Sequence, residues 1–189
     1  MDVVYHASRT KGLTEIRCNS STHGESYVYA AKDVVHSALF LSCLGGDLTC
    51  QIGCEDEIST ITERYPGAFK ERYLGTSGSI YLLNGKDFVE GKTGWDVEVI
   101  ATTNQSVLNE IVVEDVYTYL MSFKTNGQLR ILEYPNRPSF IPKDDSDLIV
   151  KCVQFTKVFG SSYLKEVEKF HPTLLDKVIK ELRASSMPR

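Results

Sequence analysis

The N-terminal half of the chain contains side chains that suit a site for a flat, polar ligand. A neutral imidazole such as His6 can donate a hydrogen bond from one ring nitrogen and accept one at the other. Rings such as Tyr29 and Phe40 can stack on a flat ligand and attract a cation. Ser37 lies eight residues beyond Tyr29, and Phe40 lies eleven beyond it. A carboxylate such as Glu98 can stabilise a positive charge that develops on a substrate.

The sequence lacks the motifs of several other common kinds of catalytic site and metal site. It contains no Walker loop, no GxGxxG, no HExxH and no GxSxG. Cys50 and Cys54 look like half of a metal site, but no second cysteine or histidine pair stands at ligand spacing to complete it. We therefore expect no bound metal. Five cysteines, an odd number, are typical of reduced thiols in an intracellular protein.

Length and composition indicate a folded, soluble protein. The chain has 189 residues, of which 42% are hydrophobic and 24% charged, close to the globular average. No segment approaches the roughly 18 apolar residues of a membrane span, and the N-terminus lacks a basic region followed by an apolar stretch. We expect a cytoplasmic protein that does not bind membranes. Its formal net charge of -4 gives no general attraction to nucleic acid.

Two predicted strands and a helix place the candidate residues of the first part of the chain. The predicted order is a strand at 3–6, a turn at 9–12, a polar loop at 19–26, a strand at 27–31 and a helix from 32 to a stop at 45–46. His6 then lies near the end of the first strand. Tyr27 and Tyr29 share one face of the second strand by alternation. Ser37 and Phe40 belong to the helix, whose apolar positions recur at intervals of three and four residues.

The rest of the chain is predicted to form further strands and then helices. Strands are expected at 58–62, 78–83, 95–101 and 111–113, a turn at 84–85, and a helix or a last strand from 116. A connector with prolines follows, and amphipathic helices are expected at roughly 146–158 and 161–184, with a break near His171-Pro172. This irregular order indicates an α+β fold. We predict a core domain at 1–135 and a connector with a helical appendage at 136–189.

The segment from about residue 3 to residue 45 resembles the NAD site of the ADP-ribosyltransferase superfamily, of the diphtheria-toxin-like and poly(ADP-ribose) polymerase-like type. That family carries a His-Gly-Ser or His-Gly-Thr strand end, then a Tyr-Phe-Ala strand, then a helix with a serine, a small residue and an aromatic residue. The chain has Tyr5-His6-Ala7-Ser8-Arg9, then Tyr27-Val28-Tyr29-Ala30-Ala31, then Ser37, Ala38 and Phe40. Ala7 replaces the usual glycine, and Phe40 replaces the usual tyrosine. The resemblance implies a split β-sandwich of two small sheets around an NAD cleft, with flanking helices.

The resemblance also implies a role for each of these residues, with NAD as a substrate. His6 would bond a ribose hydroxyl of NAD, and Tyr29 and Phe40 would enclose its nicotinamide ring. Ser37 and the main chain at Ala7 would bond the nicotinamide carboxamide. The predicted NAD-binding set is His6, Ala7, Ser8, Tyr27, Tyr29, Ser37 and Phe40.

A glutamate on a later strand completes the His-Tyr-Glu set of this family. Breaking the bond between nicotinamide and ribose builds positive charge on the sugar, which a nearby carboxylate stabilises. We assign this role to Glu98, with His6 and Tyr29 as the other catalytic residues. Glu110 and Glu114 are the alternative glutamates, in a setting that looks less like a strand.

The predicted function is transfer of ADP-ribose from NAD to an unidentified acceptor, which is a protein, a nucleic acid or water. Alternation in the expected strand 95–101 places Asp96 on the same face as Glu98. In toxin relatives the position two before the catalytic glutamate helps to select the acceptor. Asp96 is therefore the predicted acceptor-recognition residue. A protein partner bound through the C-terminal helices is a further expectation.

Other interpretations of the same residues stay open. One is a catalytically silent module whose NAD cleft is degenerate, as in a toxin-antitoxin or phage-defence interaction protein. Another is an RNA 2'-phosphotransferase, a relative that uses NAD, although only Arg9 and Arg17 supply positive charge nearby in the sequence. A purely structural explanation also exists, since Phe40 fits a core position and His23 and His36 fit a loop and a solvated helix face.

Overall fold

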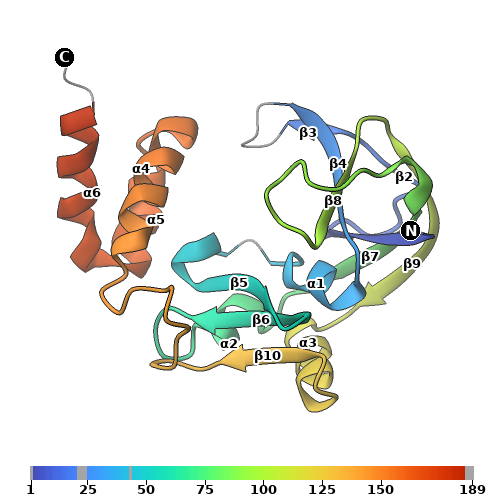
Figure 1. Cartoon of the computed structure of the whole chain (residues 1–189), viewed down its shortest axis with the longest axis horizontal. Helices are drawn as coiled ribbons and strands as arrows, with labels where there is room; N and C mark the ends of the chain where they lie inside the picture. The colour runs from blue at the N-terminus through green and yellow to red at the C-terminus, as the bar shows by residue number, and fades with distance from the viewer. Residues whose placement is uncertain (1, 21–24, 43, 186–189) are drawn as a thin grey trace. The chain divides into compact units, whose positions relative to one another are not determined.

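Most of the candidate residues lie on one seven-stranded sheet. The computed structural model describes residues 2–20, 25–42 and 44–185. The sheet order is β2-β9-β7-β1-β4-β3, and β8 pairs with β4 outside this path. Its strands are β1 (Val3–Ser8), β2 (Glu15–Ile16), β3 (Asn19–Ser20), β4 (Ser26–Ala31), β7 (Gly78–Asn84), β8 (Glu98–Ala101) and β9 (Gln105–Val113). Figure 1 shows how β9 bends as it runs beside β7, so the sheet curls around its own core.

A second sheet has three strands in the order β10-β6-β5. These are β5 (Cys50–Glu55), β6 (Ile58–Glu63) and β10 (Leu129–Leu132). Contacts divide the chain into a first unit of Met1–Cys43, Gly53–Thr60 and Lys70–Arg130 and a second unit of Leu44–Ile52, Ile61–Phe69 and Ile131–Arg189. The last boundary lies near the predicted one at 135, but two internal segments of the predicted core domain belong to the second unit.

The helices confirm an α+β chain, and most of them lie in its C-terminal part. They are α1 (Val34–Leu39), α2 (Ala68–Tyr73), α3 (Val116–Thr125), α4 (Ser146–Phe159), α5 (Tyr163–Phe170) and α6 (Pro172–Ser185), with short 3-10 turns at Gly46–Leu48 and Gly85–Asp87. The predicted helices near the C-terminus are confirmed, and the break falls at His171 as expected. The segment from 116 is a helix rather than a strand. Among the described helices, none is long and apolar enough to cross a membrane.

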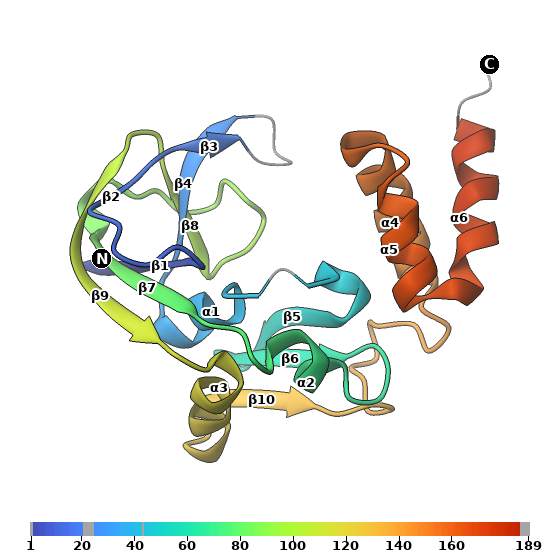
Figure 2. The ribbon, with the colours of Figure 1, turned by 180° about the vertical axis from the view of Figure 1, so that it is seen from behind.

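Each unit has its own apolar core. In the first unit the core residues are Val4, Ile16, Val28, Ala30, Tyr81, Leu83, Phe88, Val99 and Ala101. In the second unit they are Leu48, Leu148, Cys152, Val167, Phe170, Leu174 and Val178, which pack α4, α5 and α6 together, as Figure 2 shows from behind. Alternation along β4 and β8 turns Val28, Ala30 and Val99 toward the first core. Tyr29 and Glu98 are thereby turned toward the other face of the sheet.

Three predicted elements differ from the structure by several residues in their limits, and the polar loop expected at 19–26 begins with the short strand β3. The helix expected from 32 to 46 stops at Leu39, because the amides of Phe40 and Leu41 bond three residues back, at 3.0 and 3.1 Å, and tighten the last turn. The strand expected at 95–101 begins only at Glu98, since the Glu98 amide bonds to the Trp95 carbonyl at 3.1 Å and closes a turn. The short strand expected at 111–113 is the end of the nine-residue strand β9.

Candidate functional site

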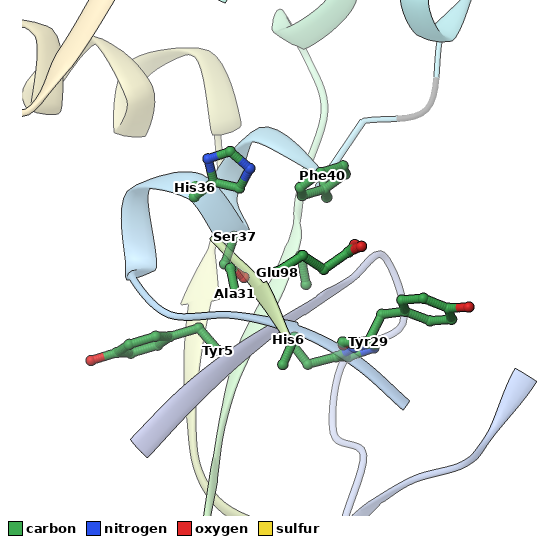
Figure 3. A pocket seen from close by; sticks show the side chains of 10 residues that line it. Tyr5, His6, Tyr29, Ala31, His36, Ser37, Phe40 and Glu98 are labelled. Carbon is green, nitrogen blue, oxygen red and sulfur yellow. Dashed lines mark hydrogen bonds between the residues drawn. The ribbon is translucent and has the colours of Figure 1, made fainter. Parts of the chain in front are cut away.

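A pocket in the first unit brings together most of the predicted residues. It has a volume of about 150 Å³. Its lining consists of Tyr5, His6, Ala7, Tyr29, Ala30, Ala31, His36, Ser37, Phe40 and Glu98, which Figure 3 shows as sticks. Six of them were predicted as site residues, namely His6, Ala7, Tyr29, Ser37, Phe40 and Glu98. The elements β1, β4, α1 and β8 therefore meet at one hollow.

The His6 side chain bridges β1 and β4 at the pocket. In the described register these strands pair at Tyr5 and Ala31. Further along β4, the main-chain oxygen of Tyr29 lies 2.7 Å from Nδ1 of His6. A carbonyl oxygen only accepts hydrogen bonds, so Nδ1 carries the proton in this contact. In the neutral ring the other nitrogen, Nε2, then has a lone pair that can accept a bond from a ligand hydroxyl.

Burial keeps the His6 ring neutral. Loss of hydration lowers the pKa of His6, and the hydrogen bond to Tyr29 raises it by a smaller amount. The ring therefore acts at neutral pH as a donor at one nitrogen and an acceptor at the other, and not as a cation.

Ala7 adopts an ordinary strand conformation. It pairs with Ile80 in the antiparallel register between β1 and β7. Any L-residue can adopt this extended backbone. Alanine in place of the family's glycine therefore costs no strain at this position.

The short helix α1 carries the next group of pocket side chains, and its first turn is capped. The Asp33 carboxylate accepts a hydrogen bond from the His36 amide at 2.7 Å and caps the start of α1. All residues from Val35 to Leu39 are buried. A helix this short and this buried is held by its packing against β1 and β4 and not by intrinsic propensity.

Two buried polar atoms in the pocket wall lack a hydrogen-bond partner among the described residues. They are Oγ of Ser37 and Nε2 of His36. The two residues are 1% and 0% exposed, respectively. The other ring nitrogen of His36 lies 3.3 Å from Oγ of Ser59. Buried polar groups are nearly always paired in folded proteins, so each of these atoms calls for a polar partner. The two side chains belong to consecutive residues of α1 and leave the helix in different directions.

His36 was predicted to lie on a solvated helix face, and this prediction is wrong. The ring is fully buried, and burial lowers its pKa, with Asp33 opposing the shift. Periodicity along one helix could not show this, because α1 is covered on several sides by strands distant in sequence. The spacing of His36 and Phe40, four residues apart on one helical face, was the signal available. His23, the other histidine of the structural alternative, lies outside the described residues.

Aromatic rings surround the mouth of the pocket. Phe40 is 38% exposed, so the alternative that it is a core residue is wrong. Its ring centroid lies 5.6 Å from that of His36 and 6.0 Å from that of Trp95. In Figure 3 the carboxylate of Glu98 extends into the space between the rings of Phe40 and Tyr29. A flat ligand entering this space would meet a ring on two sides and a carboxylate beside it.

The register of β4 and β8 places Glu98 at this point. Glu98 pairs with Ala31, and Tyr29 pairs with Ile100. Cross-strand partners share a face, and so do alternate residues of one strand. Glu98 and Tyr29 therefore lie on the same face of the sheet.

Three predicted residues do not line the pocket. Ser8 ends β1, and its hydroxyl accepts a hydrogen bond from the Thr10 amide at 3.1 Å. Tyr27 shares a face with Tyr29, their centroids 5.9 Å apart, but its hydroxyl bonds to the Glu25 carboxylate. The prediction that Asp96 lies on a strand beside Glu98 is wrong, because Asp96 is an exposed residue of the turn that precedes β8.

The alternative glutamates lie elsewhere in the first unit. Glu110 lies within β9, so its predicted setting outside a strand is wrong. Its carboxylate accepts hydrogen bonds from the Gly12 amide at 3.0 Å and the Ser79 hydroxyl at 2.5 Å, which lower its pKa. Glu114 pairs with Lys11 at 2.9 Å and is exposed. The pocket lining includes neither of them.

The described residues contain no group of three or more histidine, cysteine, aspartate or glutamate side chains that could hold a metal ion. Cys50 is buried and Cys54 is exposed.

Comparison of the chain with protein-family models, with curated proteins and with solved structures found no match. The site is therefore interpreted from its own geometry.

Proposed function

We propose that the chain is an NAD-dependent ADP-ribosyltransferase, which breaks the bond between nicotinamide and ribose and transfers ADP-ribose to an acceptor. One observation carries the proposal. Six residues that the family resemblance singles out, spread from position 6 to position 98, line a single pocket. Buried residues placed for packing alone have no reason to converge in this way.

The size of the pocket suits one end of NAD. Its volume of about 150 Å³ is below the roughly 300 Å³ at which pockets for whole ligands begin. It can hold the nicotinamide ring and part of the adjoining ribose. The rest of the molecule would lie along the protein surface outside the pocket.

The unpaired hydroxyl of Ser37 matches a carboxamide group. Ser37 Oγ can donate a hydrogen bond to the carboxamide oxygen. Ser37 is also the residue that the family resemblance assigns to this bond.

Charge and ring chemistry also fit the nicotinamide end of NAD. Its ring carries a positive charge, which Glu98 and the rings of Tyr29 and Phe40 would attract. Phe40 retains the stacking of the family's usual tyrosine and lacks only the hydroxyl.

In the proposed reaction the bond between the ribose carbon and the ring nitrogen breaks, and nicotinamide leaves with the electron pair. The Glu98 carboxylate stabilises the positive charge left on the sugar. His6 Nε2 accepts a hydrogen bond from a ribose hydroxyl and holds the sugar in place. A nucleophile then bonds to the sugar carbon and loses a proton. The acceptor is a protein side chain, a nucleic acid group or water.

The test measures nicotinamide release from NAD by the wild-type protein and by Glu98→Gln, with Glu114→Gln as a matched control outside the pocket. We expect release by the wild type and by the control, and a loss of roughly 10²- to 10³-fold in Glu98→Gln, because one electrostatic contact to the transition state is removed. Thermal shift with excess NAD should show that all three proteins still bind it.

Other outcomes would assign a different function. Stabilisation by NAD without nicotinamide release would favour the silent binding module. NAD-dependent removal of phosphate from an RNA with an internal 2'-phosphate would favour the RNA 2'-phosphotransferase. No stabilisation of the wild type by NAD would contradict the proposal altogether.

A further inference from the structure

The second unit contains a larger groove between α4 and α6. It has a volume of about 630 Å³, and its lining is Ser146, Ile149, Val150, Val153, Gln154, Lys157, Lys177, Lys180, Glu181 and Ser185. The two helices contact each other, and Figures 1 and 2 draw them as neighbours. We call this feature the α4-α6 groove. All of its residues belong to the second unit, far in sequence from the pocket residues.

The floor of the groove is an apolar strip on α4. Leu148, Cys152 and Thr156 form the buried face of this helix. Ile149, Val150 and Val153 lie on an adjacent face, and Val150 is 62% exposed. Ile149 and Val153 are partly buried against the helical core of the second unit, so Val150 extends an apolar strip from that core to the surface, which suits a partner.

The rim of the groove carries an excess of positive charge. Lys157, Lys177 and Lys180 face one carboxylate, that of Glu181. Within the described residues, no ion pair engages any of these lysines. The charge of Lys177 acts only weakly on a neighbouring carboxylate, that of Asp144, whose pKa is lowered mainly by hydrogen bonds from Ser146. The patch is positive in a chain whose formal net charge is -4.

We propose that the α4-α6 groove binds an acidic amphipathic helix of a partner protein. Leucine-like side chains at intervals of three and four residues would fill the floor, and glutamate or aspartate beside them would pair with the rim lysines. Nucleic acid would match the lysines but would not supply aliphatic side chains for the floor. A flat membrane surface could contact the rim lysines, but it would not place side chains in the groove. The proposal does not rest on NAD chemistry.

The first test uses a displayed library of helical peptides of about 16 residues, which span roughly 24 Å. Every member has leucine on one face, and the flanking positions vary among acidic, basic and neutral residues. Selection against the full-length wild-type protein should enrich acidic sequences. No enrichment, or enrichment without acidic bias, would overturn the proposal.

The second test measures the affinity of one enriched peptide by fluorescence anisotropy. Reversing the rim with Lys177→Glu and Lys180→Glu together should weaken binding about tenfold or more, whereas Lys92→Glu with Lys165→Glu should not. For the floor, Val150→Ser should weaken binding at least threefold, and Val158→Ser, which is 59% exposed on α4 outside the groove, is its control. Binding that both groove variants leave unchanged would contradict the proposal.

Two further measurements identify other occupants. Sedimentation with phosphatidylserine vesicles that the rim reversal abolishes, without peptide binding, would assign the surface to a membrane. Concentration-dependent association in analytical ultracentrifugation that Val150→Ser abolishes would assign it to a second copy of the chain. Either result would replace the acidic helix as the occupant.

Discussion

Nδ1 of His6 lies 2.7 Å from the main-chain oxygen of Tyr29. This contact joins two strands that share one paired position in the described register. It also fixes which ring nitrogen is free to accept a bond in the pocket. One side chain thus has a structural role at Nδ1 and, under the proposed function, a ligand role at Nε2, and the two roles can be separated by mutation.

His6→Asn should separate them, because an asparagine amide can replace the Nδ1 donor but has no group at the position of Nε2. We expect the variant to keep its unfolding temperature and to lose about threefold to tenfold in NAD affinity, the usual value of one hydrogen bond. His6→Ala should lose both stability and affinity. Thermal unfolding and NAD titration of the two variants test this. Equal NAD affinity in His6→Asn and the wild type would remove His6 from the binding site.

Ser37→Ala should produce opposite effects on stability and on binding. The Ser37 hydroxyl is buried without a partner among the described residues, so its removal should leave the unfolding temperature unchanged or raise it. If the hydroxyl serves the nicotinamide carboxamide, NAD affinity should fall about threefold to tenfold.

Ser42→Ala is the matched control for this variant. The Ser42 hydroxyl is also buried, but it donates to the Arg72 carbonyl at 2.6 Å. Its loss should destabilise the protein by about 1 kcal/mol and leave NAD affinity unchanged. Destabilisation of Ser37→Ala to the same degree, with normal NAD affinity, would show that Ser37 is an ordinary buried residue.

His6 and His36 should make stability depend on pH. Burial lowers the pKa of His6 and of His36 in the folded protein. Below the unfolded value of about 6.5, the unfolded chain takes up protons that the folded chain does not, so stability falls as the pH falls. Above that value both states are neutral, and neither histidine contributes to the pH dependence.

Unfolding temperatures measured from pH 7.5 to pH 5.5 test this prediction. The window stays above the range in which Glu110 and Asp115 act, since their lowered pKa values cost stability only as the pH falls further. We expect the temperature to fall across the window in the wild type, and to fall less in His6→Asn. An unchanged temperature, or an equal fall in the variant, would contradict a neutral, buried His6.

Patterns within short segments of the sequence were sufficient to predict some of the strands and helices. Strand alternation placed Tyr27 and Tyr29 on one face, where the structure also has them, because the strand period is a property of neighbouring residues. Helical periodicity similarly predicted α4 and the helices on either side of His171. These signals need no knowledge of the rest of the fold.

The features that the sequence could not predict depend on contacts between segments that are distant along the chain. Glu110 lies in a strand because β7 pairs with β9 and brings Ser79 and Tyr81 to its carboxylate. His36 is buried because strands cover α1. No spacing along the chain carries this information.

The last prediction concerns Arg64, whose guanidinium is fully buried in the second unit. It pairs with Asp145 at 3.1 Å and with Asp147 at 2.7 Å, at the start of α4. Asp145 has a left-handed backbone, with φ of 55°, and also pairs with Arg137 at 2.7 Å. The charges of Arg64 and Arg137 therefore hold a strained residue that begins the helix.

Arg64→Met should destabilise the second unit by about 3 kcal/mol, because it leaves partly buried carboxylates without their main partner. Arg17→Ala removes an exposed pair with Glu15 at 3.3 Å and should change stability by less than about 1 kcal/mol. Urea unfolding followed by circular dichroism reports mainly the helices, whereas fluorescence of the single tryptophan, Trp95, reports the first unit. We expect Arg64→Met to shift the dichroism transition more than the fluorescence transition. Equal shifts would mean that the two units unfold together, and no shift would mean that the buried ion pairs do not stabilise α4.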